Sequence, residues 1–289
     1  MIRKGVCYYS PNSGEMLAME PLRPLTLGEL LDRTFQIYKN NFWLFVGIAS
    51  VAYLPMFIIR VGLVSATGAG RSSVGVALAL GILLWLVLYM IGVAAAQSAT
   101  IIAVSAVHLE RPITVREAYA RVRGMLGRII LLMIGIGLAV GLGFLLLIVP
   151  GIIFFLMWGL AVPVAVLEDA SLGEAMSRSR QLTAGHRGRV FAIYFLFFVL
   201  SVVLSLGLEA PLGVLVAVYH NNASDVLAIV QIASVVIAYV SQLLVTPLLT
   251  ISLSLMYYDE RVRKEAFDIE LMMRSLEGDQ RPSAAATAS

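Results

Sequence analysis

The sequence predicts an all-α, polytopic membrane protein with six transmembrane helices, arranged as three repeats of an amphipathic interfacial helix followed by two spans. Composition is the first observation: of 289 residues, 60% are hydrophobic and only 13% are charged, a balance typical of membrane proteins. The second is a set of long apolar runs bounded by charged segments. The third is a short polar pattern that occurs three times, at Thr26, Glu29 and Arg33, at Thr114, Glu117 and Arg121, and at Ser171, Glu174 and Arg178.

The repeated pattern is that of a capped helix. In each copy a Ser or Thr suits the N-cap, and the Glu three residues later can accept a hydrogen bond from the backbone N–H of that cap. The Arg lies one turn further on, on the same face as the Glu. Because each copy precedes an apolar run, we expect repeats over about 26–107, 114–167 and 171–257. The alternative is that unrelated helices beside a membrane converge on one pattern.

The first repeat follows a polar leader. Residues 1–24 lack the run of ~7–15 apolar residues that a signal peptide needs, so we expect a poorly ordered cytoplasmic segment. Three methionines are candidate start residues, namely Met1, Met16 and Met19. The first amphipathic helix is expected over about 26–40, with spans over 42–61 and 74–107.

The second repeat is predicted to contain an amphipathic helix over 108–128 and a third span over 129–149. Pro150 and Gly151 are expected to form the hairpin turn, since neither residue favours the interior of a helix. The following apolar run, 152–167, reaches only ~24 Å as a helix, whereas the hydrocarbon core is ~30 Å thick. Whether this run crosses the membrane completely is therefore left open.

The third repeat begins with an amphipathic helix within 168–185 and continues into a fifth span over 190–208. Polar residues and Pro211 predict an outer connection over about 209–225. The sixth span, 226–257, is rich in Ser, Thr and Gln. A cytoplasmic tail over 269–289 is expected to be largely disordered.

Lysine and arginine gather on one side of this topology. The segment before the first span (residues 1–41), 108–128, 168–189 and the segment after 257 hold 19 of the 21 basic residues, whereas the other side keeps Arg60 and Arg71. The positive-inside rule then predicts a multi-pass protein of the cytoplasmic (inner) membrane, with both termini in the cytoplasm. If the long run 74–107 were two spans, the arginines of 108–128 would lie outside the cytoplasm. We therefore predict one span over 74–107. A single helical membrane domain is expected over 25–268.

Residues suited to catalysis or metal binding do not form any familiar pattern. His108, His186 and His220 lack the spacing of metal ligands, and no GxSxG or phosphate-loop motif is present. We therefore expect no enzyme, no catalytic residue, no metal and no cofactor. A cluster of Glu168 and Asp169 with nearby arginines leaves a membrane-face lipid enzyme as a third hypothesis, although capping and ion pairing explain these acids more simply.

Arginines beside the predicted spans suit the head groups of anionic lipids, each contributing ~1 kcal/mol near a charged leaflet. Simple enforcement of topology is the alternative explanation, and the two are compatible. A protein partner or a homo-oligomer is also open, because Gly137 and Gly141 form a GxxxG pair. Nucleic acid is not an expected partner, since the charges follow a membrane surface. Beyond the repeated pattern, the expected anionic-lipid contacts are Arg116, Arg123, Arg128, Arg180, Arg187 and Arg189.

Three stretches together resemble a known family. They are Leu25 to Arg33, Val149-Pro150-Gly151-Ile152 through Pro163 and Glu168 to Ser179, and Tyr257 to Phe267. As a set they are similar to the membrane domain of bacterial glycerophosphoryl diester phosphodiesterases and its stand-alone integral membrane relatives. The resemblance covers about 25–268. The resemblance implies that, where this membrane domain is fused to a catalytic domain, catalysis belongs to a separate barrel of ~250 residues. The rest of this chain has no room for such a domain.

These observations favour a non-enzymatic membrane protein with a lipid-contacting or partner-organising role. The alternative is a transporter or channel for a small or lipidic solute. Its support is the polar sixth span, together with Gln97, Ser98 and Thr100 in the second span. Such residues more often join helices to one another. The absence of a mid-depth cavity would count against transport.

Overall fold

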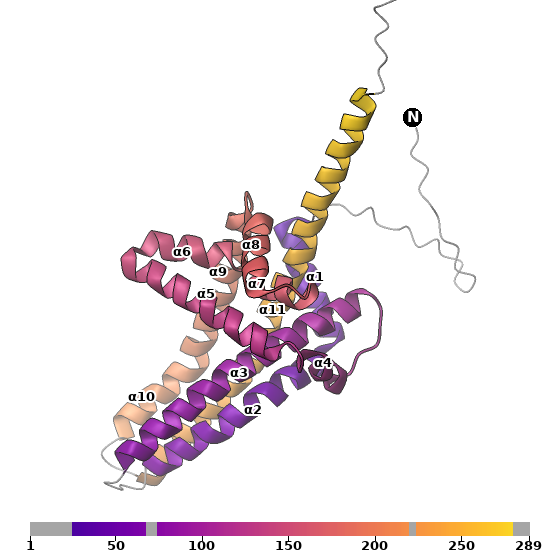
Figure 1. The fold of residues 1–289 in the computed structure, drawn as a ribbon. Helices are drawn as coiled ribbons and strands as arrows, with labels where there is room; N and C mark the ends of the chain where they lie inside the picture. The colour runs from indigo at the N-terminus through magenta and orange to yellow at the C-terminus, as the bar shows by residue number, and fades with distance from the viewer. Residues whose placement is uncertain (1–24, 68–73, 220–223, 280–289) are drawn as a thin grey trace, which may run out of the picture.

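The computed structural model describes residues 25–67, 74–219 and 224–279, with side chains placed except at 64–67, 74–78, 218–219, 224–228 and 266–279. Within these ranges every regular element is a helix (Figure 1). The expected leader, Cys7, Arg71 and His220 lie outside the described residues. The helices are α1 (Leu27–Asn40), α2 (Phe42–Thr67), α3 (Val74–His108), α4 (Val115–Val122), α5 (Leu126–Leu146), α6 (Ile148–Met157), α7 (Ala161–Leu167), α8 (Leu172–Thr183), α9 (Arg187–Leu204), a π-helix (Ser205–Glu209), α10 (Ala210–Tyr219) and α11 (Ser224–Asp279).

Six stretches of the described chain are long and apolar enough to cross a membrane, as predicted. They are Phe42–Leu63, Ala79–His108, Leu126–Leu146, Ile148–Leu167, Arg187–Ala217 and Ile229–Glu265. The chain is therefore a multi-pass helical membrane protein. The fourth stretch has 20 residues and is longer than the predicted run 152–167. It is not one continuous helix, because a short break separates α6 from α7.

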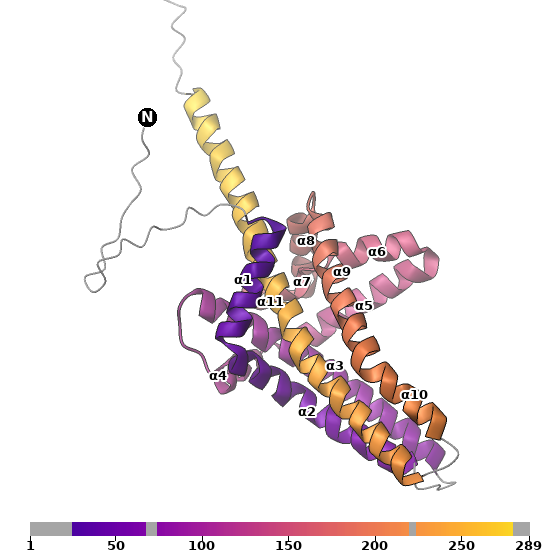
Figure 2. The same cartoon turned by 180° about the vertical axis from the view of Figure 1, so that it is seen from behind.

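The body of the protein is a bundle in which α2, α3, α10 and α11 run side by side (Figures 1 and 2). Phe45 and Ile48 of α2, Ile101 of α3 and Ile251 of α11 are fully buried between these helices. On α3, alanines face the neighbouring helices, and such small side chains let helix backbones approach closely. The capped helix α1 joins this core through Thr34, whose hydroxyl accepts a 3.2 Å hydrogen bond from Ser252 of α11.

The hairpin of α5 and α6 leaves the bundle at an angle (Figures 1 and 2). The chain reverses at Leu147, the one extended residue between the helices, with φ −162° and ψ 148°. The predicted turn at Pro150 and Gly151 is therefore wrong by three residues. Pro150 is tolerated in the first turn of α6, where its missing N–H would have no partner. Gly151 is buried, and the ring of Phe144 approaches it so closely that a Cβ at this position would collide with the ring.

Three helix boundaries also differ from prediction. The helix continues past Glu209 to Tyr219 through a five-residue π-helix, so the predicted outer connection begins too early. A local widening of this kind accommodates Pro211, which cannot donate to the preceding turn. Within the predicted helix 108–128, α4 spans only 8 residues. At the other end α11 runs to Asp279, well into the tail that we expected to be disordered from 269.

Candidate functional site

All three capped helices are present. The N–H of the cap residue donates to the Glu carboxylate at 2.8 Å in α1, 3.0 Å in α4 and 2.9 Å in α8. The bonds from Ser171 lower the pKa of Glu174, because a carboxylate that accepts hydrogen bonds is favoured in its charged form. Of the arginines that follow, Arg178 binds two carboxylates, whereas Arg33 and Arg121 are exposed.

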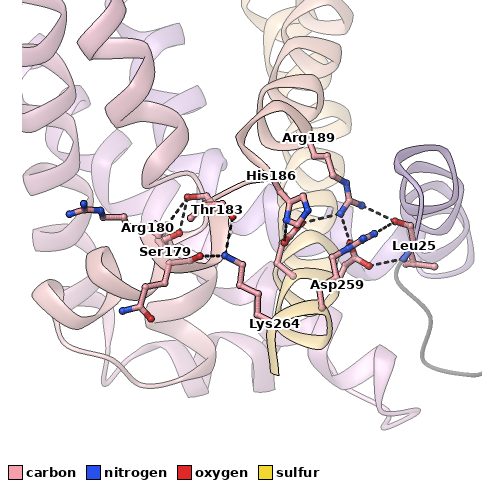
Figure 3. A network of polar contacts seen from close by, with 12 residues as sticks. Leu25, Ser179, Arg180, Thr183, His186, Arg189, Asp259 and Lys264 are labelled. Atoms are coloured by element: carbon pink, nitrogen blue, oxygen red, sulfur yellow. Dashed lines mark hydrogen bonds and ion pairs between the residues drawn. The ribbon is translucent and has the colours of Figure 1, made fainter. Parts of the chain in front are cut away.

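Helix α11 carries two buried carboxylates near the end of the sixth span (Figure 3). We call this side of the protein, which also holds α1, α4 and α8, the charged end. The side chain of Asp259 is 2% exposed and that of Glu260 is fully buried. Arg189 of α9 lies between them, with Nη1 at 2.6 Å from Asp259 Oδ2 and 3.0 Å from Glu260 Oε1. Arg263, one turn along α11, donates to Asp259 from Nε at 2.9 Å. The two buried charges are thus compensated by arginines, as buried carboxylates require.

The same group clamps the backbone at Leu25, just before α1 (Figure 3). The Leu25 N–H donates to Asp259 Oδ1 at 2.7 Å. Its carbonyl accepts from Arg189 at 2.9 Å and from Arg263 at 2.6 Å. Three segments that are far apart in the sequence are therefore joined at one point. We call Leu25, Arg189, Asp259, Glu260 and Arg263 the clamp.

Glu168, at the end of α7, centres a second polar group. Its Oε1 accepts from the hydroxyl of Tyr257 at 2.7 Å and lies 3.5 Å from Arg178 Nε. Arg178 also reaches Glu265 at 2.7 Å, and Glu265 accepts from Arg261 at 2.9 Å. The acid that we considered for catalysis is thus engaged by a tyrosine and an arginine.

Helix α8 is fixed to its surroundings by hydroxyls and one lysine. Ser179 and Thr183 both donate to the carbonyl of Met157 where α6 ends, at 3.0 and 3.2 Å. On the other side Lys264 donates to the carbonyls of Gln181 and Ala184, which lie at the end of α8 (Figure 3). These contacts satisfy carbonyls that helix ends leave without partners.

The predicted lipid-contacting arginines, apart from Arg187, fall into two sets. Arg128 and Arg189 are engaged within the protein: Arg128 pairs with Asp169 and donates to its carbonyl at 2.9 Å, and Arg189 belongs to the clamp. Arg187 is half-buried and belongs to neither set. The other set is exposed and forms no ion pair with a described residue, and in Figure 3 the Arg180 guanidinium points away from the network. Arg121, from the repeated cap pattern, is exposed in the same way and is counted with them. The exposed set therefore consists of Arg116, Arg121, Arg123 and Arg180.

Arg60 lies away from the charged end, at a small cavity of about 60 Å³ between α2, α3 and α11. Aromatic side chains line the same cavity, among them Trp85, Tyr89 and Tyr239. Arginine among tyrosines and tryptophans is typical of a membrane interface. The described part of the chain also contains no cluster of three or more acids, histidines or cysteines that could hold a metal.

Sequence reasoning missed most of the clamp. The sequence places Asp259 and Arg263 only in the charged segment after 257, and Leu25 carries no polar side chain that could mark it. The signal available was the pair of adjacent acids after the polar sixth span, with Arg189 at the start of the fifth. Nothing in their spacing indicates which helices meet.

The charged end belongs largely to the stretch from α5 to α11. A family described as the membrane domain of glycerophosphoryl diester phosphodiesterase matches this stretch, over residues 129–284. The chain belongs to this family. The match covers a membrane domain and contributes no catalytic domain. No curated protein and no solved structure matches the chain.

Proposed function

We propose that this protein is a non-enzymatic component of the cytoplasmic membrane that binds anionic lipid head groups through its exposed arginines. The carrying observation is the division between the two arginine sets. Arginines that stabilise the fold are already paired with acids, whereas Arg116, Arg121, Arg123 and Arg180 are exposed on short helices beside the spans. Exposed guanidinium groups at this depth suit lipid phosphates, to which arginine can donate two hydrogen bonds at once.

The orientation forms part of the proposal. Except for Arg60 and Glu209, the charged residues with described side chains lie in α1, α4, α8, the segments around them, and the ends of the spans next to them. By the positive-inside rule this end faces the cytoplasm, together with Leu25 and the projecting end of α11. The three capped helices, each followed by two spans, support an origin by internal repetition.

A non-enzymatic role is supported by the environment of the acids. Glu168 and the clamp acids each bind an arginine, and the matched family region is a membrane domain. Transport has less support, because most hydroxyls of α11 are used within their own helix; the observation in its favour is the cavity lined by Thr246 and Thr250. Thr250 donates to the Thr246 carbonyl at 3.0 Å and Ser254 to the Thr250 carbonyl at 2.7 Å.

The test is lipid retention by a variant in which all four exposed arginines are replaced by glutamine. The protein is purified in nanodiscs that contain phosphatidylglycerol and phosphatidylcholine, and the retained lipids are counted by native mass spectrometry. We expect the preference for phosphatidylglycerol to fall about tenfold or more, since each arginine contributes ~1 kcal/mol. The variant with lysine at the same positions keeps the charge and should keep most of the preference.

A second control is Arg60→Gln, which removes an arginine from the opposite end and should leave the preference unchanged. An unchanged preference in the fourfold glutamine variant would contradict the proposed function. The same result would show that these arginines only fix the topology.

A further inference from the structure

A cavity of about 330 Å³ lies where the α5–α6 hairpin separates from the bundle. Residues from α3, α5, α6, α7, α9 and α11 line it, so it sits between the hairpin and the long helices. The volume is within the range of sites that bind small molecules, ~300–1,000 Å³. The lining residues used below are Gln97, Met133, Gly137, Trp158, Thr246 and Thr250.

The chemistry of the lining selects an uncharged ligand. No Asp, Glu, Lys, Arg or His lines the cavity, and most lining side chains are apolar. Gln97 contributes an amide that can donate and accept hydrogen bonds. Thr250 donates to its own helix, so its oxygen remains able to accept. A charged head group here would lose its hydration without a counter-ion, which is strongly unfavourable.

The polar part of the cavity lies deep in the membrane. Thr250 and Thr246 are ~14–20 Å along α11 from Asp259 at the charged end. The hydrocarbon core is ~30 Å thick, so these hydroxyls are near its middle. An apolar chain alone would fill such a space but would leave Gln97 without a hydrogen-bond partner. A lipid with a hydroxyl group matches both the apolar side chains of the lining and its hydrogen-bonding group, Gln97.

We propose that this cavity binds a neutral, single-chain lipid with a free hydroxyl group, of the monoacylglycerol class. The acyl chain lies against Trp158 and the α5 face, and the glycerol hydroxyls bond to Gln97 and Thr250. The inference uses none of the exposed arginines. It can therefore fail while the proposed function holds, and the reverse is also true.

Gly137 offers a direct way to close the cavity. A Cβ at this glycine would meet no atom within 4 Å, so Gly137→Phe directs a ring into open space without displacing the backbone. Gly137→Ala removes the same glycine but leaves the cavity open. Leu138→Phe places a ring on the next residue of α5, where the side chain is 65% exposed and does not line the cavity.

The experiment uses a monoacylglycerol with a photoreactive diazirine in its chain, added to the full-length protein in phosphatidylcholine nanodiscs. We expect saturable labelling of peptides that contain Met133 or Trp158, with competition by unlabelled monoacylglycerol. In Gly137→Phe this labelling should fall at least about fivefold, while both control variants retain it.

Gln97→Leu tests the polar contact separately and keeps the volume of the side chain. We expect saturable binding of the monoacylglycerol probe to weaken about five- to tenfold, as the loss of one hydrogen bond predicts. Labelling by an uncharged hydrocarbon diazirine should not change. If Gly137→Phe does not elute as a single folded species in size-exclusion chromatography, Gln97→Leu decides the matter.

Three results would overturn the proposal. The first is equal labelling of wild type and Gly137→Phe, or of wild type and Gln97→Leu, which would mean contact from bulk lipid. The second is stronger competition by a fatty acid or by phosphatidylglycerol, which would mean a charged ligand. The third is a dimer in native mass spectrometry, with cross-links through α5 that Gly137→Phe abolishes. A second copy would then occupy this face.

Discussion

Arg189 and Arg180 lie on neighbouring helices at the same end of the protein, yet their environments are opposite. The Arg189 side chain is 18% exposed and contacts two buried acids and a backbone carbonyl. Arg180 is exposed and its guanidinium points away from the polar network (Figure 3). One arginine neutralises charge that the fold has already buried, and the other is free to bind something outside. Equal formal charge therefore corresponds to different tasks.

The largest loss of stability, relative to the matched change at Arg180, is expected from Arg189→Gln. Removing this guanidinium leaves Asp259 and Glu260 buried with less compensation, and breaking a buried ion pair costs ~3–5 kcal/mol. We expect a strong fall in thermal stability in detergent, measured by circular dichroism. Arg180→Gln is the matched control and should change the free energy of unfolding by less than about 0.5 kcal/mol.

A double-mutant cycle with Asp259→Asn sharpens this comparison. If the two residues act through their contact, the double variant should be less destabilised than the two single changes would predict when added. Full additivity would mean that Arg189 stabilises the protein through its other partners, such as the carbonyl of Leu25.

A smaller effect is expected from Arg128→Gln. Arg128 and Asp169 are paired, but their side chains are 30% and 83% exposed, so solvent weakens the attraction. We expect a loss of about 1 kcal/mol, mostly from the bonds to the carbonyls of Asp169 and Ala165. Asp169→Asn keeps those carbonyls and should therefore cost less. A loss as large as that of Arg189→Gln would contradict the division by burial.

The smallest effect is a pH dependence at the cap of α8. The pKa of Glu174 is lowered in the folded protein, so its stabilising contribution is present above the pKa of the unfolded chain. That contribution disappears as the pH falls through the folded value. Wild type should therefore lose slightly more stability than Glu174→Gln between about pH 6 and pH 3. A melting temperature that falls in parallel for both proteins would argue against the cap.

Local patterns predicted the elements of this fold well. Charge-free length predicted six spans, and the spacing of hydroxyl, acid and base located the starts of α1, α4 and α8. Both signals depend on neighbours within a few residues. For this reason they can be found without knowledge of which helices touch.

Features that depend on packing were not predictable in the same way. Pro150 and Gly151 carry the residue types of a turn, but the reversal falls at Leu147 and both residues lie in α6, where Gly151 packs against Phe144. Pro211 suggested a connection, yet the chain continues from the π-helix, which ends at Glu209, into α10, which contains Pro211. The division of the arginines depends on acids that are distant in the sequence, as Asp259 and Glu260 are from Arg189, and the sequence near each arginine does not reveal them.

The clamp at Leu25 has a consequence for how the protein is made. Leu25 and α1 precede the other described helices in the chain, yet the side chains that hold this backbone come from Arg189, Asp259 and Arg263, the last of them 238 positions later. Contacts over such a separation form late, because the whole intervening chain must first be inserted. We therefore expect the backbone around Leu25 to reach its final place only after the sixth span is inserted. Of the described helices, α1 comes first in the chain and is expected to be among the last to settle.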